Sequence, residues 1–279
     1  YFLQIMGHQV TVFEEKSKLG GMLRYGIPNY RFPRVRLQED IDAILSTGVE
    51  VQLNANIGTK ELEELNQQYD AIYIAIGAHT DKKLGLEGED SGNVISAVDM
   101  LREIGDDKYP DFTGKRIIVV GGGNVAMDCA RTAIRAHAKT VSIVYRRRQD
   151  DMTALPEEVE GAIAEGIELL TLKAPLRIEA DENGNAAALW VQPQMIGPVR
   201  GGRPSPKKAT KPEERLECDV ILMAVGQDIV SKPFEKAGIA VNRGCLQADA
   251  TGALNRVGMY AGGDCVSGPA TVIKAIAAG

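Results

Sequence analysis

The residues best suited to chemistry are the glycines of Gly121–Ala126, a hexapeptide that matches the pattern G-x-G-x-x-A. A strand predicted over Arg116–Val120 precedes it and a periodic helix follows it, which is the context in which this pattern binds a dinucleotide. Gly121 permits the tight turn, and Gly123 lets the backbone approach a pyrophosphate at the positive end of the helix dipole. The alternative interpretation is a purely structural glycine turn.

The end of the next predicted strand indicates which dinucleotide would bind. An acidic residue there would bond the ribose hydroxyls of NAD, but this sequence has Tyr145 followed by the arginine run Arg146–Arg148. Arginine binds a 2′-phosphate through charge-assisted hydrogen bonds, whereas a carboxylate would repel it. The run therefore favours NADP(H) over NAD(H), the alternative being a solvated basic loop.

A second nucleotide is indicated by Glu14, which ends a strand predicted over Val10–Glu14 after the tail of a helix. This arrangement is typical of the second half of a βαβ unit, in which the acidic residue holds a ribose. The alternative is an ordinary surface strand end. The first strand and glycine turn of such a unit would precede Tyr1, so we expect the chain to begin partway into a domain.

Near the other end of the chain, Gly262-Gly263-Asp264 follows a short predicted strand and precedes an apolar helix. Asp264 could bond the ribityl chain of a flavin. The amino terminus of the helix, at Thr271, could face the flavin pyrimidine and stabilise negative charge on the reduced ring. This helix is expected to continue beyond Gly279.

The elements that position these residues alternate between strands and helices and form two similar halves. The runs 71–78 and 218–226 are both predicted as buried strands that end in a glycine turn, the second at Gly226. This repetition predicts an α/β fold with two Rossmann-like dinucleotide-binding domains, one inserted into the other. The Pro- and Lys-rich stretch 201–214 is predicted to be a polar loop.

Composition excludes several classes of protein. The 279 residues carry a formal net charge of −6, which argues against nucleic-acid binding, and no apolar run is long enough for a membrane helix. The four cysteines form no CxxC pair and no metal-ligand spacing, so we predict no metal site and expect a reducing, cytoplasmic setting. Hydride transfer between cofactors needs no acid–base pair, and we therefore predict no catalytic side chain.

Taken together, these stretches resemble the NADPH-dependent glutamate synthase small-subunit family, a group of two-dinucleotide-domain flavoproteins built like glutathione reductase. Its relatives include ferredoxin–NADP reductase subunits and the flavin half of dihydropyrimidine dehydrogenase. The stretches that carry the resemblance span nearly the whole chain and lie at 20–33, 75–78, 119–131, 144–167, 224–227 and 261–279.

The resemblance implies two cofactors and two domains. It implies an incomplete FAD domain over residues 1–87 and 230–279, with an NAD(P)H domain over 88–229 inserted in it. The residues that it places near FAD are Glu14, Leu19, Gly20, Gly21, Arg24, Gly263, Asp264 and Thr271. The residues that it places near NADPH are Gly122, Gly123, Asn124, Val125, Asp128, Arg146 and Arg147. Gly121 and Gly226, each in a glycine turn after a predicted strand, are also predicted to bind a cofactor.

The resemblance also implies an activity, in which hydride passes from NADPH to FAD and electrons continue to iron–sulfur clusters outside this chain. The family's cysteine-rich cluster region and FAD glycine turn are absent, which puts FAD retention by this chain in question. Three hypotheses stay open. The chain is part of a glutamate synthase small subunit whose partner is the glutamine amidotransferase synthase subunit, part of another cluster-linked reductase such as a ferredoxin–NADP reductase, or a non-catalytic nucleotide-binding module.

Overall fold

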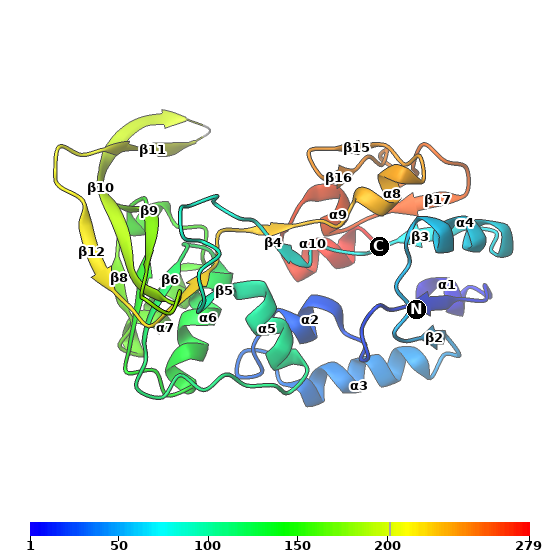
Figure 1. The fold of residues 1–279 in the computed structure, drawn as a ribbon. Helices are drawn as coiled ribbons and strands as arrows, with labels where there is room; N and C mark the ends of the chain where they lie inside the picture. Colours follow the sequence, from blue (N-terminus) through cyan, green and yellow to red (C-terminus); the bar gives the residue numbers. More distant parts are fainter. Residues whose placement is uncertain (201) are drawn as a thin grey trace. The chain divides into compact units, whose positions relative to one another are not determined.

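The computed structural model describes residues 1–200 and 202–279, and these residues form two compact units (Figure 1). Unit 1 comprises Tyr1–Thr80 and Gln227–Gly279, and unit 2 comprises Asp81–Gly226, so the second is inserted in the sequence of the first. The chain leaves unit 1 through β4 (Thr80–Asp81) and returns through β14 (Gln227–Asp228), and these two short strands pair with each other.

Unit 2 contains a parallel five-stranded sheet, an antiparallel four-stranded sheet and three α-helices. Its elements are β5 (Val94–Ser96), α5 (Ala97–Gly105), β6 (Arg116–Val120), α6 (Asn124–Arg135), β7 (Thr140–Val144), the 3-10 helix η1 (Gln149–Asp151), α7 (Pro156–Ala164), β8 (Glu168–Leu170), β9 (Lys173–Ala180), β10 (Ala186–Arg200), β11 (Arg203–Lys208), β12 (Glu214–Glu217) and β13 (Val220–Met223).

In the parallel sheet, β6 lies at the point where the order of the strands reverses. The order is β5-β13-β6-β7-β8, and Val120 at the end of β6 is in register with Val144 of β7 and Met223 of β13. The chain after β6 moves through α6 to β7 on one side, while β13 on the other side comes from a much later part of the sequence. Open α/β sheets bind ligands at the carboxyl ends of strands beside such a reversal.

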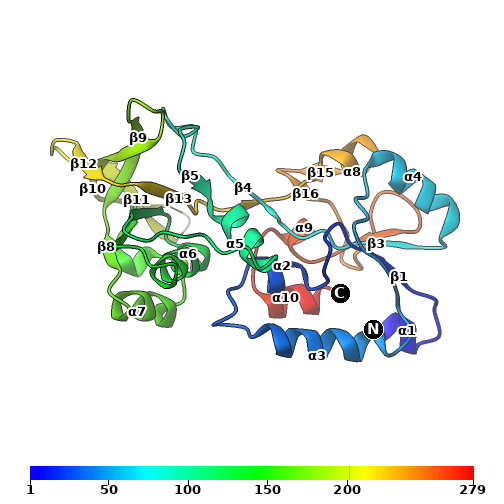
Figure 2. The ribbon, with the colours of Figure 1, turned by 60° about the horizontal axis from the view of Figure 1, so that its bottom comes forward.

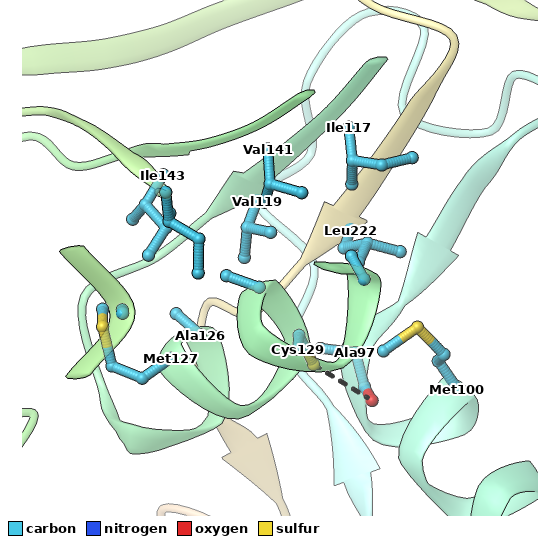
Figure 3. Packing of buried hydrophobic residues seen from close by; sticks show 14 of the residues in the cluster. Ala97, Met100, Ile117, Val119, Ala126, Met127, Cys129, Val141, Ile143 and Leu222 are labelled. Atoms are coloured by element: carbon cyan, nitrogen blue, oxygen red, sulfur yellow. Dashed lines mark hydrogen bonds between the residues drawn. The ribbon is translucent and has the colours of Figure 1, made fainter. Parts of the chain in front are cut away.

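Both faces of the parallel sheet are covered, which explains why β6 and β13 are apolar without alternation. Ile117 and Val119 of β6 pack against α5, α6 and α7, whereas Ile118 and Val120 pack against the antiparallel sheet. Figure 3 shows the helix side of this core, including the buried Cys129, whose thiol donates to the Ala97 carbonyl at 3.8 Å. Figure 2 shows α6 and α7 on this same side of the sheet.

The prediction of a loop over 201–214 was wrong for 203–208 and 214, whereas 209–213 is indeed without regular structure. Arg203–Lys208 forms β11, which pairs antiparallel with β10 from Gln194 to Arg200, and β12 begins at Glu214. Position 201 lies outside the described residues. Its proline and lysine content favoured a loop. An edge strand such as β11 nevertheless tolerates proline, because the N–H groups on the outer side of the strand need no partner.

Unit 1 is built from short elements around a smaller core. They are α1 (Phe2–Ile5), β1 (Thr11–Phe13), α2 (Gly21–Tyr25), α3 (Arg34–Leu45), β2 (Glu50–Gln52), α4 (Thr59–Gln68), β3 (Ile72–Ile74), α8 (Lys232–Lys236), β15 (Val241–Asn242), β16 (Cys245–Leu246), β17 (Met259–Ala261), α9 (Asp264–Ser267) and α10 (Val272–Ala277).

The strands of unit 1 pair in twos, and their parallel pairs are β1 with β2 and β3 with β17. The core lies around the second pair, where Ile74 and Met259 pack with Phe234 of α8 and Leu62 of α4. No helix in the described part of the chain combines the length and the apolar character needed to cross a lipid bilayer.

Candidate functional site

The glycine loop after β6 is shaped by close approaches on both of its sides. A Cβ atom at Gly121, where φ is +151°, would lie 2.2 Å from the Ala224 carbonyl oxygen. A Cβ atom at Gly122 would lie 2.5 Å from the ring of Tyr145. Both positions therefore need glycine because the protein itself leaves no space for a side chain.

Gly123 differs from its two neighbours. A Cβ atom there would meet only the Thr153 hydroxyl, at 3.4 Å, so packing within the protein does not demand glycine. Gly123 is the N-cap of the twelve-residue helix α6 and has no side chain to accept from the first-turn amides. These amides carry the positive end of the helix dipole. The lack of a side chain at Gly123 thus opens them to an anionic ligand.

The segment Thr153–Leu155, between η1 and α7, braces the glycine loop. The backbone amides of Thr153 and Ala154 donate to the Gly122 carbonyl at 3.0 and 3.1 Å. The Leu155 amide donates to the Asn124 side-chain oxygen at 2.8 Å. Asn124 therefore uses this oxygen within the protein. No role was predicted for this segment, which lies within the stretch 144–167 and is followed by the proline that begins α7.

The arginine run follows β7, and its three members have different surroundings. Arg148 pairs with Asp151 at 2.9 Å, and this contact holds the pKa of the Asp151 carboxyl below its usual value. Arg147 donates to the Pro204 carbonyl at 3.2 Å. Arg146 is exposed, and no hydrogen bond or ion pair joins its guanidinium to the part of the chain that the structure describes. Arg146 is therefore the cation most available to a ligand.

The other residues predicted for this site lie at different depths. Asp128 is 3% exposed, on the buried face of α6. Val125 is half-buried in the first turn of α6. Gly226 lies after β13 with φ of +119° and is exposed. The structure thus places the glycine loop at the start of α6, with Asp128 further along the same helix.

In unit 1, Glu14 directly follows β1 and continues its pairing. Its amide donates to the Gln52 carbonyl at 2.9 Å, and one carboxylate oxygen accepts from the Lys16 amide at 2.8 Å. The half-buried side chain is thereby held at the carboxyl end of a parallel strand, where the ribose of a nucleotide is usually bound.

The buried side chain of Arg24 is hydrogen-bonded to the turn that precedes α2. This guanidinium is buried and donates to the Leu19 carbonyl at 2.6 Å and to Gln38 at 3.0 Å. A Cβ atom at Gly20, where φ is +123°, would lie 2.9 Å from Leu37. Gly21 also has positive φ, at +47°. Arg24 and Gly20 therefore shape the turn, and Gly21 has open space beside it.

The second group of predicted residues in unit 1 lies between β17 and α10. Gly263 has φ of +72° and is the N-cap of α9, which begins at Asp264. One carboxylate oxygen of Asp264 accepts from the Ala270 amide at 3.2 Å, which ties α9 to the approach of α10. Thr271 is the exposed N-cap of α10. These residues fit a flavin by their chemistry, since a carboxylate and the positive-φ glycine Gly263 follow strand β17.

The sequence matches the family described as "Pyridine nucleotide-disulphide oxidoreductase" over residues 2–279. The beta subunit of the NADP(+)-dependent formate dehydrogenase of Moorella thermoacetica is 39% identical over 284 residues, covering 100% of this chain and 40% of that protein. A putative glutamate synthase (NADPH) small chain of Cereibacter sphaeroides is 34% identical over 289 residues, covering 98% of this chain and 69% of that protein.

Among solved structures, FprA of Mycobacterium tuberculosis in complex with NADPH superimposes with a TM-score of 0.80 at 20% identity, covering 95% of this chain and 74% of that one. This likeness confirms the predicted fold class, a Rossmann-type α/β fold with two dinucleotide-binding domains. The chain spans 40% of the formate dehydrogenase subunit and 69% of the synthase small chain.

Proposed function

The chain belongs to the pyridine nucleotide-disulphide oxidoreductase family, and we propose that it is the NADPH-oxidising, FAD-binding part of a larger flavoprotein reductase. When bound, NADPH would supply a hydride and FAD would supply the acceptor for it and the link to further electron carriers. The protein contributes binding, orientation and electrostatics. No side chain needs to donate or take up a proton at this step.

The observation that carries the proposal is the combination of an open helix terminus with one available cation. The first-turn amides of α6 lack a side-chain acceptor because Gly123 is the N-cap, which suits a pyrophosphate. Arg146 follows β7, the strand beside β6, and its guanidinium has no described protein partner. An exposed arginine at this strand end fits a 2′-phosphate. We assign NADPH to unit 2 on this basis.

We assign FAD to unit 1. Glu14 would hold its ribose, Asp264 its ribityl chain, and the turn at Gly20 and Gly21 would approach it through backbone. Arg24 supports this turn through the Leu19 carbonyl and does not need to touch the cofactor. Thr271, at the start of α10, would lie near the flavin ring.

Two kinds of full-length parent protein are candidates, and each is supported by a relative. Glutamate synthase small subunit is our first candidate, because the resemblance to that family covers nearly the whole chain. A different cluster-linked reductase is the second candidate, favoured by the 39% identity to the beta subunit of an NADP(+)-dependent formate dehydrogenase. In both cases iron–sulfur clusters outside this chain would take the electrons.

The test is an anaerobic visible spectrum of the full-length protein that contains this chain, recorded before and after addition of NADPH or NADH. A flavin band that bleaches faster with NADPH supports both cofactor assignments. Bound flavin that neither nucleotide reduces would instead favour a non-catalytic nucleotide-binding module. After reduction, the protein is mixed either with the glutamine amidotransferase synthase subunit, glutamine and 2-oxoglutarate, or with a ferredoxin. The mixture that reoxidises the flavin distinguishes the two parents.

A further inference from the structure

The hairpin of β10 and β11, labelled in Figure 1, supplies residues that contact the segment Tyr145–Asp151 although they are distant from it in sequence. Arg203, the first residue of β11, donates to the Tyr145 hydroxyl at 3.0 Å and to the Asp151 carbonyl. The Pro204 carbonyl next to it accepts from Arg147 at 3.2 Å. The hairpin therefore contacts the segment Tyr145–Asp151 at its beginning and at its end.

These contacts hold the two ends of the segment Tyr145–Asp151 together. The Tyr145 hydroxyl donates to the Asp151 carbonyl at 2.8 Å and accepts from Arg203, so the three groups form a closed set of hydrogen bonds. Tyr145 and Asp151 are both buried, at 8% exposure. Arg146 lies within this segment, directly after Tyr145, and its position depends on how firmly the two ends of the segment are held together.

The glycine loop has separate support. Its Gly122 carbonyl is held by the Thr153 and Ala154 amides, and Asn124 by the Leu155 amide. None of these bonds involves Arg203. Loss of Arg203 would therefore loosen the arginine segment while the pyrophosphate-binding amides of α6 keep their position.

We propose that Arg203 is a positioning residue for cofactor choice, which holds Tyr145–Asp151 closed so that Arg146 meets the 2′-phosphate of NADPH. The inference rests on the assignment of NADPH to unit 2. Its consequence is selective, because a loosened segment costs contacts to the 2′-phosphate, which NADH lacks. The β10–β11 hairpin thus contributes to the selectivity for NADPH over NADH.

The test is titration of the full-length protein with NADP+ and with NAD+, comparing wild type with Arg203→Met and Arg203→Lys. We expect Arg203→Met to raise the Kd for NADP+ about tenfold, the equivalent of one charge-assisted hydrogen bond, and the Kd for NAD+ less than about twofold. Arg203→Lys keeps one donor and should fall between. Lys208→Met, which removes an exposed cation at the other end of β11, is the matched control and should leave both constants unchanged.

Equal losses for the two nucleotides, or no loss for either, would overturn the proposal. If Arg203→Met lowers the melting temperature of the protein, Tyr145→Phe decides, because it removes the shared hydroxyl and keeps the buried ring. Tyr145→Phe should weaken NADP+ selectively, and adding Arg203→Met to it should cost less than Arg203→Met costs alone. Additive losses would contradict the closed set of bonds.

Arg146→Ala separates this inference from the proposed function. If that variant leaves the ratio of the two dissociation constants unchanged, the assignment of NADPH to this site fails. If it changes the ratio while Arg203→Met and Tyr145→Phe do not, the NADPH assignment stands and only the role of Arg203 is refuted.

Discussion

The ring of Tyr145 lies against Gly122, so that a Cβ atom at Gly122 would come within 2.5 Å of the ring. The two residues lie at the carboxyl ends of neighbouring parallel strands, β7 and β6. One belongs to the glycine loop and the other begins the arginine segment. This contact packs the glycine loop against the first residue of the arginine segment, while the hydrogen bonds that hold the loop come from Thr153–Leu155.

Replacing Gly122 with alanine should therefore disturb stability and binding together. The new methyl group has to displace a buried ring, which typically costs about 1–3 kcal/mol of folding free energy. NADP+ binding should fall as the ring moves. Thermal melts and nucleotide titration measure the two effects.

Gly123→Ala is the matched comparison, because its Cβ atom would meet only the Thr153 hydroxyl, at 3.4 Å. We expect its unfolding free energy to stay within about 0.5 kcal/mol of wild type while nucleotide binding falls. A Gly123→Ala protein that binds NADP+ normally would contradict close approach of a ligand at this position.

Changing Arg146 to alanine, alone or with Arg147, should weaken NADPH binding far more than NADH binding. Each charge-assisted hydrogen bond lost is worth about 1.5–3 kcal/mol, which is about tenfold or more in Kd. Arg146 has no described protein partner, so the melting temperature should not change with the single variant. Parallel titrations with both nucleotides test this, and equal losses would refute contact with the 2′-phosphate.

Glu165 joins α7 to α6 and should make the stability of unit 2 depend on pH. Its carboxylate binds Arg135 at 2.6 Å and Arg131 at 2.9 Å, and these hydrogen bonds lower the pKa of Glu165 from 4.5 to about 2. A lowered folded-state pKa means that the contribution is complete above the unfolded value and is lost as pH falls from 4.5 toward 2.

Glu165→Gln should therefore be less stable than wild type at pH 7, by about 1 kcal/mol for a partly exposed pair. The difference should shrink as pH falls below about 4.5. Denaturant melts across this range measure it, with Glu160→Gln as the control, an exposed glutamate on the same helix. A difference that stays constant down to pH 2 would contradict the ion-pair explanation.

Glu89 should be important for folding of the segment that enters unit 2. The buried carboxylate accepts from three successive backbone amides, Leu84 at 3.0 Å, Gly85 at 2.6 Å and Leu86 at 3.0 Å. In Glu89→Gln one side-chain oxygen is replaced by a donor, which leaves at least one of these part-buried amides without its acceptor and costs about 1 kcal/mol or more.

Asp90→Asn provides the control for this change. Its side chain is 90% exposed and pairs with the exposed Lys83, so the unfolding free energy should change by less than about 1 kcal/mol. Equal destabilisation by the two variants would show that the three amides are not what makes Glu89 important.

The sequence alone determined the fold class and the place of the glycine loop. Both depend on local patterns, namely a continuous apolar strand, three glycines and a periodic helix, and these act through backbone geometry that neighbours in sequence control. The prediction of a loop failed over 203–208 because pairing of β11 with β10 is a contact between strands, which local composition does not determine.

Only the tertiary structure decided what individual side chains do. Of three adjacent arginines, one pairs with Asp151, one binds the Pro204 carbonyl, and Arg146 has no described partner. Arg24 and Asp128, both predicted near a cofactor, are buried. Arg203, in a predicted loop, holds Tyr145 instead. The physical reason is that partners far apart in sequence, brought together by packing, determine the burial and hydrogen bonds of a side chain.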